Sequence, residues 1–579
     1  MKRVVVLLSF FTFALCALAS LNCVLRGVIS DGSGPLPGAT VIISAPGQAD
    51  RTVVTDANGA FSVAGLAPGT YTVQASLEGF NTVRQQVVLQ DAKTISVSLQ
   101  LPMAAVAETI TVTAASPRLY AASASMAYAV DGLDTARYKH FEEHGFVQAR
   151  NQAVTTFAID VDRASYANVR RMLNNGEPVP PDAVRIEEMI NYFSYDYPQP
   201  DGPHPFKVIS EVASCPWNPR NRLVRIGVQG RNLDQWKMQP NNLVFLLDVS
   251  GSMEGDDRIE LVKKGMRVLV DQLRAEDRVA IVVYAGAAGL VLPSTSGANK
   301  EAILAALENL KAGGSTAGGA GIELAYKVAK EAFLEKGNNR VILATDGDFN
   351  VGTTDEEALQ KLIEEKRKSG IYLSCLGVGD DNYNDSLMET LADKGNGNYS
   401  YLDSFREAKK VFEQELTGTL VTIAKDVKIQ IEFDPEKVVS YRQLGYENRA
   451  LANEDFDDDT KDAGELGAGH SVTALYEIEP RGLARSTIAF VRLRYKEPNA
   501  QRSTMLSERI VDVGTSANEA TRDFQFAAAI AEMGMLLRKS QHSGSASWDD
   551  ALAMAKIARG EDLDGTRAEL VSLIEKAKN

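Results

Sequence analysis

The stretch LVFLLDVSGS, residues 243–252, decides the fold of the central part of this chain. Its first half is a continuous apolar run, typical of a strand buried on both faces. Its second half places Asp248, Ser250 and Ser252 directly after that strand. Three more such runs (RVAIVVYA, RVILATDG and IYLSCLGVG) alternate with amphipathic helical stretches. This alternation predicts a doubly wound, Rossmann-like α/β domain with a mostly parallel sheet over residues 241–415.

Polar side chains also follow a later strand of the same domain. Asp346 comes at the end of RVILATDG, and the glycine-rich stretch GGSTAGGAG (313–321) carries Thr316. In open α/β sheets, ligands bind beyond the carboxyl ends of the strands, so we expect these groups to face one place. The set contains only oxygen donors, without His or Cys. Such ligands suit Mg²⁺, with Mn²⁺ or Ca²⁺ as alternatives.

The segments DVSGSM, GGST and TDGD occur in an order that resembles the metal-ion-dependent adhesion site of von Willebrand factor A (VWFA) domains. The resemblance implies that Ser250 and Ser252 bind the metal directly. It implies direct or water-mediated binding by Thr316, and water-mediated contacts from Asp248 and Asp346. It further implies that a carboxylate of a partner protein completes the metal's coordination. The alternative is a metal-free domain in which the aspartates only order loops.

Residues 24–102 consist of short alternating strands, separated by turn signals such as GSGPLPG, DANG and APG. About seven short strands of this kind predict a β-sandwich. The stretches GVISDGSGPLPGATV and TDANGAFSVAGLAPGTYTVQASLEGF resemble the carboxypeptidase regulatory-like domain. Residues 103–150 are rich in Ala, Ser and Thr, and we interpret them as a linker.

The regions on both sides of the α/β domain have α+β character. Residues 151–240 contain the strand TTFAIDVD, in which Asp162 is placed to cap the following helix, and residues 416–579 run from strands into helices at about 519–541, 548–558 and 563–577. FAIDVDRASYANVRRMLNNGEPVPPDAVRIEEMINYF and NEDFDDDTKDAGELGAGHSVTALYEI resemble the flanking regions of YfbK-type bacterial VWFA proteins. We expect strands from both regions to pair into one accessory β-domain.

The N-terminus has the three parts of a secretory signal peptide over residues 1–19: Met-Lys-Arg, an uncharged apolar run and an A-x-A site. An uncleaved membrane anchor is the alternative, but the run is shorter than the roughly 20 residues needed to span a bilayer. Lipidation of Cys23 is disfavoured because Asn22 and Ser20 stand where a lipobox has a small residue and Leu. We therefore expect export to the periplasm or cell surface, without a transmembrane span after cleavage.

The composition and an acidic segment of the chain bear on which ligands the protein binds. The 579 residues are 45% apolar with a net charge of −15, which does not fit a nucleic-acid binder with a basic surface. The spacing of Asp455, Asp457 and Asp459 in the acidic loop 453–465 is that of a calcium loop. Thr460 and Leu466, however, replace the required Gly and Glu, so we interpret the loop as a solvated acidic segment, with weak Ca²⁺ binding as the alternative.

Together these patterns predict an exported, multidomain, non-enzymatic protein that binds a carboxylate-bearing protein ligand through a metal ion. The first alternative is an assembly subunit or scaffold of an envelope complex. An unrecognised hydrolase is disfavoured, because no paired nucleophile and base are evident in the sequence. The sequence fixes neither the ligand nor the oligomeric state.

Overall fold

The computed structural model describes most of the chain, in two compact units that divide at Ala127 and Tyr128. The described residues are 23–30, 35–36, 39–45, 51–56, 59–67, 69–77, 83–89, 94–101, 138–233, 239–285, 288–313, 318–347, 356–380, 383–415, 421–461, 463–482, 485–498 and 500–579. The signal-peptide prediction and most of the proposed linker lie outside these ranges.

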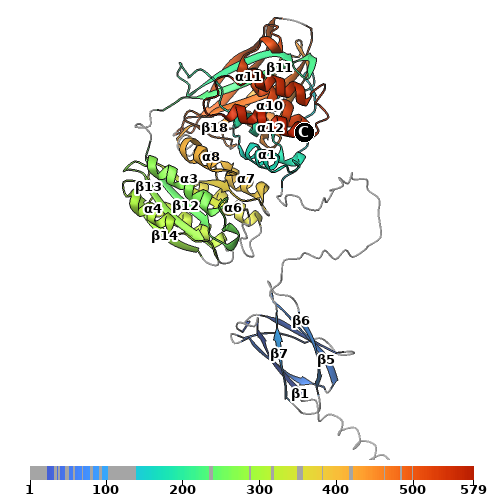
Figure 1. Cartoon of the computed structure of the whole chain (residues 1–579), viewed down its shortest axis with the longest axis vertical. Helices are drawn as coiled ribbons and strands as arrows, with labels where there is room; N and C mark the ends of the chain where they lie inside the picture. The colour runs from blue at the N-terminus through green and yellow to red at the C-terminus, as the bar shows by residue number, and fades with distance from the viewer. Residues whose placement is uncertain are drawn as a thin grey trace, which may run out of the picture. The chain divides into compact units, whose positions relative to one another are not determined.

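The N-terminal unit is a β-sandwich of two sheets, ordered β4-β1-β7 and β3-β2-β5-β6 (Figure 1). Along β1 every second side chain is buried, as expected for a strand with one face on a core. The predicted sandwich is confirmed. Its strands are β1 (Cys23–Ser30), β2 (Thr40–Ser44), β3 (Arg51–Val54), β4 (Ala60–Leu66), β5 (Gly69–Ser76), β6 (Val83–Leu89) and β7 (Thr94–Gln100).

The described cysteines are buried and form no disulfide. Cys23 opens β1 with its side chain fully inside the core of the sandwich. This position of the thiol disfavours a lipidated Cys23. Cys375, expected to be a core residue, is fully buried in a central strand of the α/β domain.

The α/β domain is built on a six-stranded sheet in the order β14-β13-β12-β15-β16-β17. All neighbouring strands are parallel except β13 and β14, and helices cover both faces, each over its own apolar core. The doubly wound prediction is confirmed. The strands are β12 (Asn241–Asp248), β13 (Arg278–Tyr284), β14 (Ala288–Ser296), β15 (Asn338–Thr345), β16 (Ile371–Gly377) and β17 (Tyr399–Tyr401). The helices are α3 (Ile259–Gln272), α4 (Lys300–Glu308), α5 (Gly318–Glu331), α6 (Glu356–Arg367), α7 (Asp385–Lys394) and α8 (Phe405–Lys410), the last continued by a π-helical turn, η4 (Val411–Glu415).

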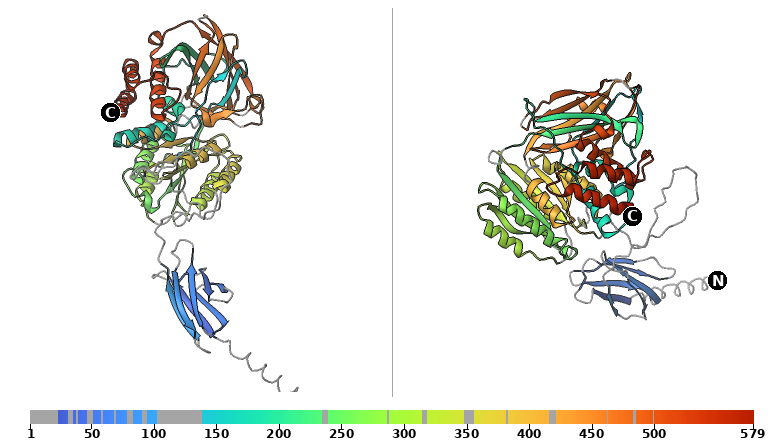
Figure 2. Two further views of the ribbon diagram at one scale, coloured as in Figure 1. Left: turned by 90° about the vertical axis from the view of Figure 1, so that its right-hand side faces the viewer. Right: turned by 45° about the horizontal axis from the view of Figure 1, so that its top comes forward.

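Strands from before and after the α/β domain pair with each other, as the sequence predicts. In one sheet, β11 pairs with β22, and Val224 faces Tyr476; in the other, β9 pairs with β18, and Phe157 faces Ile429. A single apolar core lies between the two sheets. We call this unit, with the helices described below, the accessory domain. Figure 2 shows its early green and late orange strands interleaved.

The first accessory sheet has the order β10-β11-β22-β19-β8, and the second has the order β20-β9-β18-β23-β24, with β21 paired to β18. Their strands are β8 (Val147–Gln148), β9 (Val154–Ala158), β10 (Phe206–Cys215), β11 (Asn218–Gly230), β18 (Thr422–Phe433), β19 (Val438–Leu444), β20 (Ala450–Leu451), β21 (Leu466–Gly467), β22 (Ser471–Pro480), β23 (Ser486–Lys496) and β24 (Thr504–Asp512).

Helices pack against the first accessory sheet through a second apolar core, to which Leu223 and Leu475 contribute. They are α1 (Ala164–Asn175), α2 (Ile186–Asn191), α10 (Arg522–Arg538), α11 (Trp548–Ala558) and α12 (Thr566–Lys578). Among the described residues, no helix combines the length and apolar character needed to cross a membrane.

The prediction that Asp162 caps the following helix is wrong. Arg163 occupies the N-cap position of α1, and it makes no side-chain capping bond. Asp162 instead accepts hydrogen bonds from the backbone N–H of Tyr399 at 2.8 Å and from Arg449 at 2.7 Å. The side chain of Asp162 therefore binds an arginine 287 residues away instead of capping the neighbouring helix.

Candidate metal centre

The predicted aspartates end two neighbouring strands. Asp248 is the last residue of β12, and Asp346 directly follows β15, which runs parallel to β12. Parallel neighbours end at the same edge of a sheet, so both carboxyl groups belong to that edge. Their side chains are buried, with Asp248 fully enclosed and Asp346 3% exposed.

Asp248 is held at both of its oxygens. Oδ1 accepts the backbone N–H of Ser250 at 2.8 Å, and Oδ2 accepts the hydroxyl of Thr345 at 3.0 Å. The Thr345 hydroxyl in turn accepts the backbone N–H of Gly347 at 3.3 Å. These contacts fix the orientation of the carboxylate before any ligand arrives.

The two predicted serines present their hydroxyls to each other. The Oγ atoms of Ser250 and Ser252 lie 2.9 Å apart, in a short 3₁₀ turn (η3, Gly251–Met253) that follows β12. Arg258 donates to the carbonyl of Ser252 at 2.6 Å and so ties this turn to the start of α3. The hydroxyls and the carboxylate of Asp248 therefore form one oxygen-lined cluster.

The surroundings of Asp248 disfavour its ionised form in the absence of a cation. Burial raises the pKa of Asp248, and the negative charge of Asp346 raises it further. The hydrogen bonds from Ser250 and Thr345 act in the opposite direction. A cation beside Asp248 would offset its burial and the repulsion from Asp346, and so would favour the ionised carboxylate. Because the donors are all oxygens, the cluster fits a hard divalent ion.

Thr316, the fifth predicted residue, lies outside the described residues. The last described residue before it, Gly313, donates its N–H to the carbonyl of Val249 at 2.7 Å. After it, Gly321 of α5 packs where a Cβ atom would lie 3.0 Å from Cβ of Tyr284. The structure thus brings together Asp248, Ser250, Ser252 and Asp346, and Thr316 stays a prediction.

Sequence reasoning missed Tyr284 and Thr345. Tyr284 ends β13 directly opposite Asp248, and burial raises the pKa of its hydroxyl well above the usual range. Thr345 precedes Asp346 and supports Asp248 from the neighbouring strand. The signal for both was available in principle, because each lies at the carboxyl end of a strand beside β12.

The acidic loop is neutralised by basic side chains. Arg494 of β23 lies 2.8 Å from Asp457 and 3.3 Å from Asp459, and Lys461 lies 3.3 Å from Asp455. These contacts favour the interpretation without Ca²⁺.

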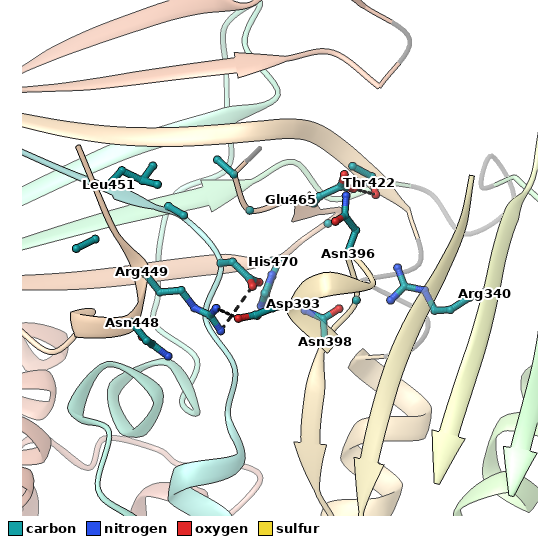
Figure 3. A pocket seen from close by; sticks show the side chains of 17 residues that line it. Arg340, Asp393, Asn396, Asn398, Thr422, Asn448, Arg449, Leu451, Glu465 and His470 are labelled. Carbon is teal, nitrogen blue, oxygen red and sulfur yellow. Dashed lines mark hydrogen bonds and ion pairs between the residues drawn. The ribbon is translucent and has the colours of Figure 1, made fainter. Parts of the chain in front are cut away.

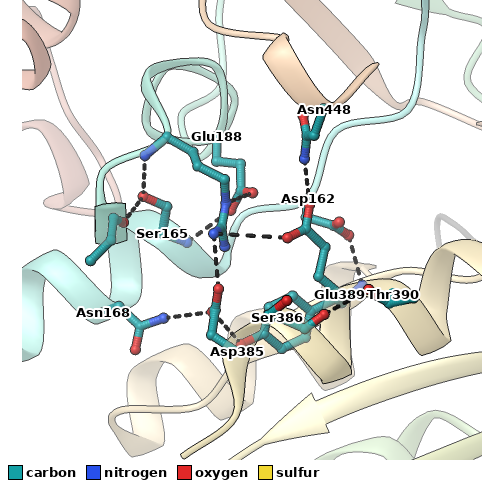
Figure 4. Close-up of polar contacts among 12 residues, drawn as sticks. Asp162, Ser165, Asn168, Glu188, Asp385, Ser386, Glu389, Thr390 and Asn448 are labelled. Carbon is teal, nitrogen blue, oxygen red and sulfur yellow. Dashed lines mark hydrogen bonds and ion pairs between the residues drawn. The ribbon is translucent and has the colours of Figure 1, made fainter. Parts of the chain in front are cut away.

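A second cluster of carboxylates lies where the α/β domain meets the accessory domain (Figure 4). Asp162, Glu188 and Glu389 are buried, and one oxygen of each lies within 4.8 Å of the others. Each already has partners: Arg449 bonds Asp162, the backbone N–H of Ser165 and Arg185 bond Glu188, and Asn448 bonds Glu389. These hydrogen bonds and ion pairs account for the cluster without a metal ion.

Family models match four parts of the chain. They are described as the carboxypeptidase regulatory-like domain (residues 24–102), von Willebrand factor (133–225), the von Willebrand factor type A (VWA) domain (242–414) and the C-terminal region of uncharacterized protein YfbK (418–579). The matches agree with the expected sandwich and α/β domain.

The chain is also similar to individual proteins and solved structures. The chain is 43% identical over 469 residues to "Uncharacterized protein YfbK" of Escherichia coli K12, a match that covers 76% of this chain and 81% of the relative. It is 32% identical over 151 residues to human inter-alpha-trypsin inhibitor heavy chain H4, covering 24% of this chain and 16% of that one. A solved von Willebrand factor type A protein from Catenulispora acidiphila aligns with a TM-score of 0.39 and 19% identity, over 64% of this chain and 90% of that one.

Proposed function

The chain belongs to the YfbK family of VWA-domain proteins, and we propose that it is an exported binding protein that recognises a carboxylate-bearing protein ligand through Mg²⁺. The VWA domain supports a role in protein–protein interaction or adhesion. The observation that carries the finer proposal is the convergence of Asp248, Ser250, Ser252 and Asp346 at one edge of the sheet.

Five side chains would hold the ion: Asp248, Ser250, Ser252, Asp346 and Thr316. When bound, the ion supplies a Lewis-acidic position that accepts a carboxylate oxygen from the partner. The protein's own contribution is orientation, since Ser250 and Thr345 fix both oxygens of Asp248. Such supporting contacts commonly change metal affinity by about 10- to 100-fold.

The remaining parts of the proposal concern organisation and place. We propose a signal peptide over 1–19, a sandwich that acts as spacer or second binding module, and a mature protein in the periplasm or on the cell surface. In this proposal the protein acts by binding a partner protein and is not an enzyme.

Calorimetric titration of the full chain with Mg²⁺ and Mn²⁺ tests the proposal. We expect one site, lost in Asp346→Ala and Ser250→Ala and kept in the control Asp201→Ala, which removes an exposed carboxylate of the accessory domain. A metal at 100 times its Kd should also stabilise the protein by about 2.7 kcal/mol. Absence of binding by folded wild-type protein would refute the metal-dependent mechanism and favour the scaffold alternative.

A further inference from the structure

A polar cavity of about 210 Å³ lies between the VWA domain and the accessory domain (Figure 3). Arg340 of β15, Asn398 before β17, Asp160 after β9 and Glu465 before β21 are among its lining residues. Arg340 stands six residues before Asp346 along the same strand direction, which is about 20 Å at the rise of a β-strand. The cavity is therefore separate from the proposed metal centre.

One end of the cavity carries an arginine without a close carboxylate. Arg340 is only 3% exposed, and its Nη1 donates to the Ser374 hydroxyl at 2.6 Å. Nε has no hydrogen-bond partner, and among the described residues Glu465 is the carboxylate whose charge acts on this guanidinium, from beyond ion-pair distance. Burial accordingly lowers the pKa of Arg340. The Ser374 hydroxyl and the ring of Tyr372, 5.9 Å from the guanidinium carbon, contact Arg340 but are neutral. Because a buried charge without a close opposite charge is costly, this end favours an incoming anion.

Glu465 does not fill that role. It lines the cavity, but it accepts the hydroxyl of Thr422 at 3.0 Å, and the positive charge of Lys425 acts on it more strongly than that of Arg340 does. The charge of Asp426 also acts on Lys425, and Asp426 is ion-paired with Lys496 at 2.6 Å. The cations of Arg340, Lys425 and Lys496 thus share two carboxylates, which leaves an excess of positive charge at this end.

The other end has the opposite excess. Arg449 is ion-paired with Asp393, and it also lies 3.7 Å from Asp160 and 2.7 Å from Asp162. Glu389 lies 3.7 Å from the same guanidinium, which therefore serves four carboxyl groups. Burial raises the pKa of Asp160 to about 7. The positive charge of Arg449 opposes this rise, and the negative charge of Asp393 adds to it. An additional cation would offset the excess of negative charge at this end of the cavity.

Neutral polar groups lie between the two ends. Figure 3 shows Asn396, Asn398 and His470 between Arg340 on one side and Arg449 with Asp393 on the other. Burial lowers the pKa of His470 to about 3, so its ring is neutral at physiological pH. The middle of the cavity can therefore form hydrogen bonds without adding charge.

From this arrangement we propose that the cavity binds a small zwitterion, a molecule of amino-acid type whose carboxylate pairs with Arg340 and whose ammonium group pairs with Asp160 and Asp393. A simple anion would compensate Arg340 but would add negative charge beside the carboxylates. A simple cation would leave Arg340 unpaired. Only a ligand with both charges matches both ends.

Calorimetry on the full chain with glycine, β-alanine and γ-aminobutyrate tests this, because the series increases the spacing between the two charges. Acetate and ethylammonium are the single-charge controls. We expect one-to-one binding of at least one zwitterion, about tenfold or more tighter than either control. Mg²⁺ titration of the same samples reports the metal centre separately.

Variants identify the cavity as the site. Arg340→Gln and Asp160→Asn should each weaken zwitterion binding about tenfold or more, and Arg150→Gln, at an exposed arginine, should not. Thermal melting verifies that each variant is folded, and Asp160→Asn keeps the test valid if Arg340→Gln does not fold. The proposal is overturned if folded wild-type protein binds none of the series at 10 mM, a concentration about tenfold above a millimolar Kd. Acetate binding as tightly as the best zwitterion, or unchanged binding in both variants, would overturn it as well.

Discussion

Arg185 of the accessory domain donates from Nη1 to Oδ2 of Asp385 in the VWA domain at 2.8 Å, and both side chains are buried. Two other accessory arginines make equivalent contacts. Arg170 pairs with Glu407 at 2.7 Å, and Arg449 pairs with Asp393. Three arginines thus hold carboxylates on the VWA surface, which makes the junction of the two domains an ion-pair seam.

Removing one arginine of this ion-pair seam should destabilise the protein strongly. Arg185→Met leaves Asp385 and Glu188 buried without their cation, and we expect a loss of about 3–5 kcal/mol in the free energy of unfolding. Urea denaturation measures it. The matched control is Arg150→Met, whose ion pair with Glu436 is exposed and should be worth less than about 1 kcal/mol. Equal small losses in both variants would contradict the buried-pair interpretation.

The stability of the accessory domain should depend on pH through Glu532. This carboxyl group on α10 is 1% exposed, accepts the backbone N–H of Ser547 at 2.9 Å, and has its pKa raised to about 7 by burial. The folded state therefore holds a proton that the unfolded chain releases near pH 4.5. Stability should fall as the pH rises from about 4.5 to 7 and level off above the folded pKa.

Glu532→Gln keeps an acceptor for Ser547 but cannot ionise. We expect it to reduce the slope of this part of the pH profile, to which Asp160 also contributes because its pKa is likewise raised to about 7, and to stabilise the protein at pH 8 by about 1–3 kcal/mol. Denaturation by urea at pH 5, 7 and 8 gives the comparison, with Glu436→Gln at an exposed position as the control. A parallel, equally steep profile in Glu532→Gln would show that another group is responsible.

Local patterns predicted much of the fold. The strands β12, β15 and β16 are continuous apolar runs, so their burial and the positions of Asp248 and Asp346 at strand ends followed from the sequence. The edge strand β14 was not predicted, because Pro293 and alternating polar residues make it look like a loop.

The ion-pair seam and the cavity could not be predicted in the same way. Asp162 meets Arg449 across 287 residues, and Arg185 meets Asp385 across 200. No spacing rule links such distant residues, since only the docking of the two domains brings them together. Arg340 carried a weak signal, because a charged residue near the start of a buried apolar strand needs a special environment.

A glycine in α3 should be required for packing rather than for flexibility. A Cβ on Gly265 would lie 2.4 Å from the ring of Phe412, which is fully buried in η4. Alanine normally stabilises a helix interior by about 1 kcal/mol relative to glycine, but overpacking of a core costs about 1–3 kcal/mol. We expect Gly265→Ala to destabilise the protein in urea denaturation. Gly265→Ala with Phe412→Leu should recover part of the loss, and a stabilised single variant would contradict the close contact.

The proposed metal centre should depend on a residue that does not itself bind the ion. Thr345→Val removes the hydroxyl that donates to Oδ2 of Asp248 while keeping the volume and strand propensity of the side chain. Because the carboxylate then loses one of its two fixed contacts, we expect Mg²⁺ affinity to fall about tenfold or more in calorimetry. Thr345→Ser keeps a hydroxyl and should restore most of the affinity, which separates positioning of Asp248 from a general loss of packing. If Thr345→Val binds Mg²⁺ as tightly as the wild-type protein while Ser250→Ala does not bind it, the ion depends on the serine hydroxyls and the orientation of Asp248 does not matter for binding.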